Sequence, residues 1–141
     1  MNAMTIMIPK ANEPRKVLLL CGSDPGTALL KEILARHAEV ASASDIPSMR
    51  SQLAEDGCDL LICDWRFSMG TWRDALEGVR HAHPDLPVLV VCRSAGEREW
   101  REVLEAGAFD LLTEPYSERA VLSVVEHAFA SRDARATRSV A

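Results

Sequence analysis

The six residues Asp59–Asp64 (DLLICD) constrain the fold of this chain more than any other stretch. A short apolar run is closed at each end by a carboxylate. Short runs without polar alternation are typical of strands buried on both faces of a parallel sheet. A charged side chain cannot stay inside such a run, so we expect Asp64 where the strand leaves the sheet. That place is the carboxyl end, where open α/β sheets build their functional sites.

Length and composition narrow the class of protein. The 141 residues suit one domain, and the net charge of −5 argues against a nucleic-acid-binding surface. No apolar run has the length of a membrane span, and the first residues lack the features of a signal peptide, so we expect a cytoplasmic protein. The 4 cysteines form no CxxC pair and have no histidine at ligand spacing. This pattern favours small buried side chains over a zinc site.

Strand-like and helix-like segments alternate along the chain. The predicted strands are 16–21, 39–44, 59–64, 88–92 and 109–113. Helical spacing of apolar residues follows each of them, over 25–34, 45–55, 72–79, 97–106 and 118–129. Asp24 is predicted to cap the first helix, with Pro25 at its first position, and Ser117 to cap the last. Right-handed crossovers then place helices on both faces of a parallel sheet. We expect a flexible leader over 1–15, one domain over 16–132 and a flexible tail over 133–141.

Over residues 16–132 the chain resembles a response-regulator receiver domain, the phospho-accepting module of two-component phosphorelay signalling. Asp59–Asp64 matches the third strand of that family, whose last residue is the phospho-acceptor, and Pro87–Cys92 matches the fourth strand. Gly107–Tyr116 (GAFDLLTEPY) matches the segment usually written GAxxYLxKPF. The resemblance implies an α/β, flavodoxin-like, doubly wound five-stranded parallel sheet of order 2-1-3-4-5 with five helices. It also implies a cis bond between Glu114 and Pro115.

The match is poor at the residues that perform the chemistry. Receivers carry two acidic residues after the first strand to hold magnesium, and here Gly22 and Ser23 stand there, with Asp24 one position later. The hydroxyl residue that ends the fourth strand is replaced by Cys92, and the lysine before the proline by Glu114. The acceptor position, Asp64, is what remains of the usual constellation.

These losses predict a receiver without effective magnesium-dependent phosphorylation. Phosphoryl transfer depends on positioning and charge neutralisation, and magnesium needs hard oxygen ligands. An ion held by Asp64 alone should bind weakly, so we expect no cofactor beyond weak Mg²⁺. Glu114 worsens the balance because it puts an anion where a cation is usual. Asp64 then either caps nearby backbone amides or remains a live phospho-acceptor, and we expect no enzymatic activity.

Two arginines suggest how Asp64 could stay charged. Arg66 lies two residues after Asp64, and Arg93 directly follows Cys92. Guanidinium groups are permanently charged and pair well with carboxylates. The hypothesis is that Arg66 or Arg93 reaches Asp64 or Glu114 and supplies the missing positive charge. The alternative is that both arginines point into solvent.

Three functions remain open from the sequence. The first is an atypical receiver that acts through protein contacts, with a histidine kinase or an output protein as partner. The family's face of helix four, strand five and helix five, here parts of 97–106 and 117–129, would then serve partners or a homodimer. The second is a working phospho-acceptor at Asp64 in an unusual pocket. The third is a small flavodoxin-like cofactor binder, because residues 22–27 open a helix where phosphate loops lie.

Overall fold

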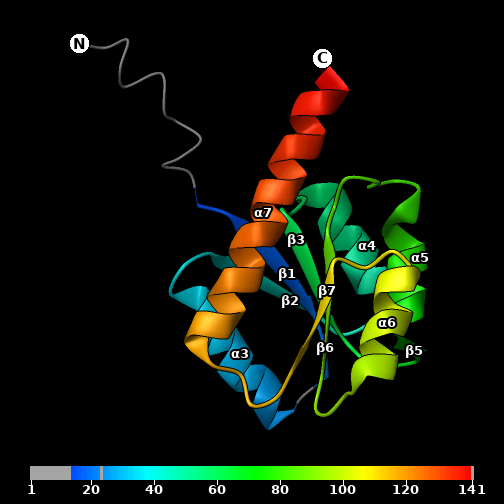
Figure 1. The fold of residues 1–141 in the computed structure, drawn as a ribbon. Coiled ribbons are helices and arrows are strands. Elements are labelled where there is room, and N and C mark those ends of the chain that lie inside the picture. The colour runs from blue at the N-terminus through cyan, green and yellow to red at the C-terminus, as the bar shows by residue number, and fades with distance from the viewer. Residues whose placement is uncertain (1–13, 23, 141) are drawn as a thin grey trace.

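The computed structural model describes residues 14–22 and 24–140, with side chains described as far as residue 135; the predictions for residues 1–13 and Ser23 lie outside this range. The strands are β1 (Lys16–Leu20), β2 (Glu39–Ala43), β3 (Leu60–Asp64), β4 (Arg66–Phe67), β5 (Gly70–Thr71), β6 (Val88–Cys92) and β7 (Asp110–Thr113). The helices are α3 (Pro25–Ala35), α4 (Ile46–Glu55), α5 (Trp72–Arg80), α6 (Glu97–Glu105) and α7 (Glu118–Val140). Every predicted strand and helix is therefore present (Figure 1).

Five parallel strands form the sheet, in the order β2-β1-β3-β6-β7. This order is the predicted 2-1-3-4-5, because β6 and β7 are the fourth and fifth strands of the sheet along the chain. The central strand β3 pairs with β1 on one side and β6 on the other. Its apolar residues Leu60, Leu61, Ile62 and Cys63 are all fully buried. Burial on both faces explains why the run lacks polar alternation.

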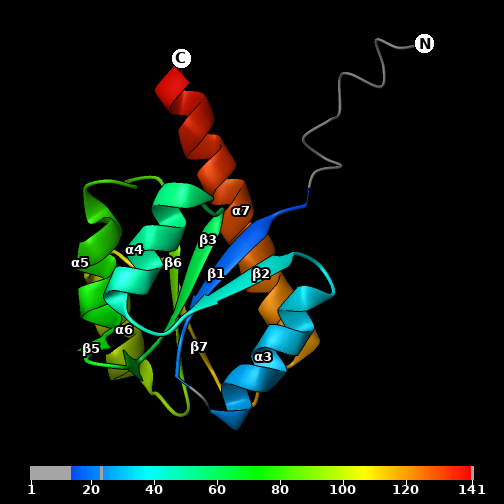
Figure 2. The same cartoon turned by 180° about the vertical axis from the view of Figure 1, so that it is seen from behind.

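Helices cover both faces of the sheet (Figures 1 and 2). Leu61 and Cys63 of β3 pack in a core with α4, α5 and α6, whereas Leu60 and Ile62 pack in a second core with α3 and α7. Successive residues of a strand point to opposite faces, so one strand supplies both cores. The predicted doubly wound α/β architecture is confirmed.

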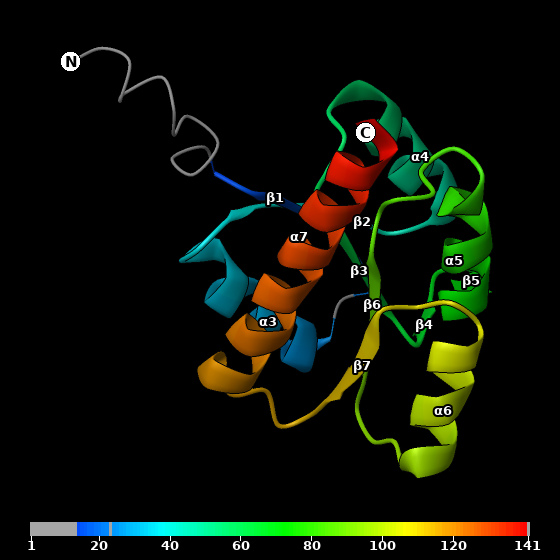
Figure 3. The same cartoon turned by 45° about the horizontal axis from the view of Figure 1, so that its top comes forward.

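Two features differ from the sequence-based expectation. A short antiparallel hairpin, β4–β5, stands where a loop was expected after Asp64, and it places Met69 fully exposed at φ 60°. The last helix also runs further than predicted, since α7 continues to Val140 through the region expected to form a flexible tail. Its carboxyl-terminal turns project past the sheet in Figures 1 and 2 and come toward the viewer in Figure 3. Within the described part of the chain, no helix is long and apolar enough to cross a membrane.

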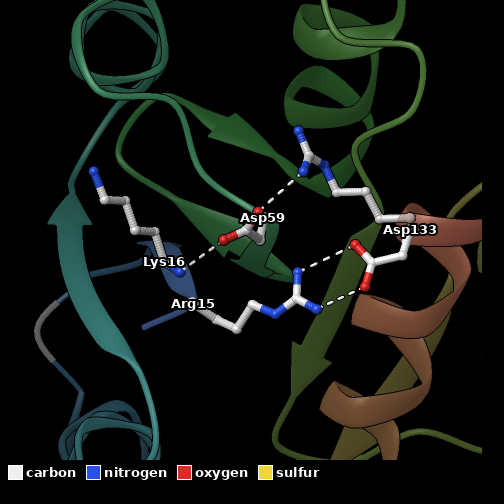
Figure 4. Close-up of polar contacts among 5 residues, drawn as sticks. Arg15, Lys16, Asp59 and Asp133 are labelled. Carbon is white, nitrogen blue, oxygen red and sulfur yellow. Dashed lines mark hydrogen bonds and ion pairs between the residues drawn. The ribbon is translucent and has the colours of Figure 1, made fainter. Parts of the chain in front are cut away.

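Polar contacts at the amino ends of β1 and β3 hold α7 against the sheet (Figure 4). The Arg15 guanidinium donates to both carboxylate oxygens of Asp133, over 3.2 and 2.6 Å. Asp59 accepts hydrogen bonds from the backbone N–H of Lys16 at 2.9 Å and from Nη1 of Arg132 at 3.0 Å. We call Arg15, Asp59, Arg132 and Asp133 the amino-edge clamp. It ties the helix to segments that are far away in sequence.

Candidate functional site

The carboxyl ends of β3, β6 and β7 meet at one edge of the sheet, as expected for parallel strands. Asp64 is the last residue of β3, Cys92 is the last residue of β6, and Glu114 follows β7. All three line a cleft of about 450 Å³. The same cleft is lined by the further predicted positions Asp24, Arg66 and Arg93. Gly22 instead borders a neighbouring cleft between β1, β2 and α3, which it shares with Asp24.

Asp64 is half-buried, and its carboxylate accepts one hydrogen bond, from the backbone N–H of Trp65 at 3.0 Å. Burial raises the pKa of Asp64 above its ordinary value, and the nearby carboxylates of Asp24 and Glu114 raise it further. The hydrogen bond from the Trp65 N–H and the positive charge of Arg93 lower this pKa. The surroundings of Asp64 therefore disfavour additional negative charge.

Neither arginine pairs with Asp64 or Glu114. Nη2 of Arg93 donates to Oδ1 of Asp24 at 3.3 Å, and the Arg93 side chain is 77% exposed. Arg66 is exposed, and its side chain forms no hydrogen bond or ion pair with any residue that the structure describes. The hypothesis that one of them pairs with Asp64 or Glu114 is therefore wrong for this structure. The physical reason is that Asp24, at the rim, offers Arg93 a partner near solvent.

The pair with Arg93 also changes the role of Asp24. Asp24 does occupy the N-cap position of α3, followed by Pro25, as predicted. Its side chain makes no capping hydrogen bond, however, because it faces Arg93 instead. Ser117 behaves as expected, since its Oγ accepts from the backbone N–H of Ala120 at 3.1 Å. The prediction that Asp24 caps the helix is thus confirmed for its N-cap position, but it is wrong for the side chain, which makes no capping hydrogen bond.

Glu114 lies against the first turn of α3. A Cβ atom at Gly26 would collide with the Glu114 carboxylate, so the absence of a side chain at Gly26 makes this approach possible. The first turn of α3 contains no acidic residue of its own. Helix N-termini carry partial positive charge, so a carboxylate there is stabilised without a lysine or a metal. The bond between Glu114 and Pro115 is cis, as the resemblance implied.

Cys92 and Tyr116 complete the cleft. The Cys92 thiol is largely buried and contacts the carbonyl oxygen of Ser94 at 3.5 Å. Burial and the nearby carboxylates raise its pKa, so the thiol stays protonated and unreactive. Tyr116 was not among the site residues predicted from the sequence. Burial is the main cause that raises the pKa of its hydroxyl, and the negative charges of Glu114 and Asp64 raise it further. Its position in the sequence, directly after Glu114-Pro115, could have indicated that it lies near the site.

The donor set fits magnesium poorly. Mg²⁺ prefers hard oxygen ligands held in octahedral geometry. Gly22 has no side-chain oxygen, and the Asp24 carboxylate is directed to Arg93. Among the residues that the structure describes, no group of 3 or more His, Cys, Asp or Glu is arranged to hold a metal ion. The described residues at this edge of the sheet therefore do not fit a magnesium ion.

Comparisons with known proteins agree with this architecture. The response regulator receiver domain family matches residues 25–126. The response regulator protein PilR of Pseudomonas aeruginosa is 31% identical over 103 residues, which cover 72% of this chain and 23% of PilR. The transcriptional regulatory protein CpxR of Escherichia coli K12 is 28% identical over 108 residues, or 77% of this chain and 46% of CpxR. The chain thus spans less than half the length of these curated relatives.

Solved structures show the same fold. A putative response regulator from Chloroflexus aurantiacus superposes with a TM-score of 0.77 at 23% identity, covering 84% of this chain and 99% of that one. The beryllofluoride-activated NtrC4 receiver domain dimer gives a TM-score of 0.75 at 19% identity, covering 83% and 98%. The order of the sheet, the placement of Asp64 at its carboxyl edge and the family match lead to one conclusion. This chain belongs to the response regulator receiver domains of two-component signalling.

Proposed function

We propose that this receiver domain is atypical and signals through protein–protein contacts without magnesium-dependent phosphorylation. The observation that carries the proposal is the charge around Asp64. Three further carboxylates, Asp24, Glu99 and Glu114, line its cleft, and Arg93, one of the two arginines there, is paired with Asp24. A phosphoryl group on Asp64 would add negative charge beside these carboxylates, and Arg66, the unpaired arginine among the described residues of the cleft, is exposed to solvent. In this proposal the domain has no catalytic turnover of its own.

The scaffold around this depleted site offers a contact surface. Trp100 of α6 is 45% exposed, and its indole N–H donates to Oδ1 of Asp110 on β7 at 3.0 Å. That bond joins two of the elements of the α6–β7–α7 face. We propose that this face binds a histidine kinase, an output protein or a second copy of the chain. Aromatic side chains that keep part of their surface exposed are enriched at protein interfaces.

Incubation with a small phosphodonor and magnesium, followed by intact mass spectrometry, tests the proposal. We expect no phosphoryl adduct on the wild-type chain and no heat of Mg²⁺ binding in titration calorimetry. Glu114→Lys is the informative companion variant, because it returns the cation to the site. An adduct that forms on wild type and is abolished by Asp64→Asn would instead establish a working phospho-acceptor.

The contact surface needs a separate measurement. Sedimentation of the wild type and of Trp100→Asp reports whether the α6–β7–α7 face joins two copies. We expect self-association, if present, to be weakened by the variant. Self-association that is unchanged by Trp100→Asp would place the dimer elsewhere on the domain.

A further inference from the structure

A second cleft lies at the opposite edge of the sheet from Asp64. It has a volume of about 550 Å³ and lies among the carboxyl-terminal ends of α5 and α6, the segments that lead into β6 and β7, and the projecting part of α7. Its apolar lining includes the buried side chains of Leu76, Val79 and Leu86 and the half-buried ring of Phe109. We call this the amino-edge groove. None of its lining residues belongs to the candidate site.

The amino-edge clamp fixes the position of α7, the helix that forms one wall of this groove. Arg132 and Asp133 of α7 are tied to Asp59 and Arg15 at the amino ends of β3 and β1 (Figure 4). Ser131 and Arg135 border the groove. They are four positions apart and therefore lie on one face of the helix. The clamp thus holds that face along the groove.

The charged rim of the groove has a single sign. Among the residues that the structure describes, its titratable lining side chains are Arg80, His83 and Arg135, with no carboxylate, although the chain as a whole carries a net charge of −5. Nη2 of Arg80 donates to the carbonyl oxygen of Ala106 at 2.9 Å, which holds the guanidinium between α5 and the end of α6; its Nη1 is 4.0 Å from Glu77.

Arg135 supplies a more available charge. It is exposed and forms no ion pair with the residues that the structure describes. A cationic rim around an apolar floor favours a ligand that combines apolar side chains with carboxylates.

We propose that the amino-edge groove binds an acidic, amphipathic segment of a partner protein. Apolar side chains of that segment would enter the floor around Phe109, and its carboxylates would face Arg80 and Arg135. In peptide-binding grooves, apolar anchor residues commonly provide most of the affinity, whereas charged residues at the rim provide specificity and orient the peptide. The groove lies away from Asp64, so this contact does not depend on the state of the phospho-acceptor position.

Fluorescence anisotropy with a short labelled peptide tests the proposal. The probe alternates pairs of glutamate with pairs of leucine, and two matched probes carry lysine for glutamate or serine for leucine. We expect only the first probe to bind the full chain. In NMR spectra, the amide chemical-shift changes that this probe causes should be largest within residues 83–87 and 106–109. Arg135→Glu should weaken binding about tenfold, because a favourable rim pair becomes a repulsive one. Arg119→Glu is the control, since it makes the same charge change at an exposed position of the same helix.

Several outcomes would overturn the proposal. Absence of binding up to about 1 mM peptide would mean that the groove has no useful affinity for this chemistry. Equal binding of the lysine probe, or equal effects of Arg135→Glu and Arg119→Glu, would show that the rim does not select the ligand. Concentration-dependent dimerisation that Arg135→Glu abolishes in the absence of peptide would identify a second copy as the occupant. Circular dichroism of each variant checks that loss of binding is not loss of folding.

Discussion

Replacing Asp59 with alanine tests whether the amino-edge clamp stabilises the fold. The substitution removes two hydrogen bonds, one from the Lys16 N–H at 2.9 Å and one from the Arg132 guanidinium at 3.0 Å. The Asp59 and Arg132 side chains are only 23% and 35% exposed, so solvent screens their attraction only in part. Nε of Arg132 is already buried without a partner among the described residues. Loss of Asp59 would leave that guanidinium still less well satisfied.

The expected cost follows from these contacts. A hydrogen bond to a charged group contributes about 1.5–3 kcal/mol, and partial exposure places the total loss at about 2–3 kcal/mol. For a domain of this size, about 1 kcal/mol shifts the melting temperature by roughly 4 °C, so we expect a decrease of about 8–12 °C. Asp59→Asn keeps one acceptor for the Lys16 N–H but loses the ion pair. Its cost should be about half as large.

Urea unfolding followed by circular dichroism measures both variants, with the slope of the transition as a check that compactness is unchanged. A double-mutant cycle with Arg132→Met isolates the ion pair from the other effects of each substitution. A loss below about 0.5 kcal/mol for Asp59→Ala, or no coupling to Arg132, would refute the view that the clamp holds α7.

The other predictions concern the candidate site and the α6–β7–α7 face. Asp64→Asn should raise the free energy of unfolding at pH 7 by about 1 kcal/mol, because an ionised carboxylate with a raised pKa costs stability above that pKa. The gain should fade as the pH falls through the raised pKa of Asp64, where the wild-type carboxylate becomes protonated, and a pH-independent difference would contradict this cause. Arg93→Ala should cost less than about 1 kcal/mol, since its pair with Asp24 is exposed, and a larger coupling in a cycle with Asp24→Ala would mean that the pair braces the cleft. Trp100→Phe should cost about 1 kcal/mol in thermal unfolding by removing the N–H bond to Asp110, and an unchanged melting temperature would show that water replaces it.

Much of the fold follows from the sequence because each main strand and helix has a recognisable local pattern of apolar residues. The unbroken apolar runs of β3 and β6 require burial on both faces, and the helical spacing between strands requires crossovers. Those two constraints suffice for a parallel sheet with helices on both sides. They also place Asp64, Cys92 and Glu114 at one edge, because parallel strands end together. The hairpin β4–β5 escaped notice because two-residue strands carry no periodicity.

The tertiary structure alone decided which charges meet. Arg93 could have turned to Asp64, to Glu114 or to solvent, and it pairs with Asp24 because α3 brings that carboxylate to the rim. From the sequence, Glu114 was interpreted as an unfavourable anion in the site. In the structure, the missing side chain at Gly26 lets the Glu114 carboxylate approach the N-terminus of α3, where negative charge is stabilised.

Asp59 closed the amino end of an apolar run in the sequence, but its partner Arg132 lies 73 positions further along the chain. Contacts between side chains so distant in sequence have no local pattern to reveal them. They depend on the relative placement of packed elements, which only the folded chain determines.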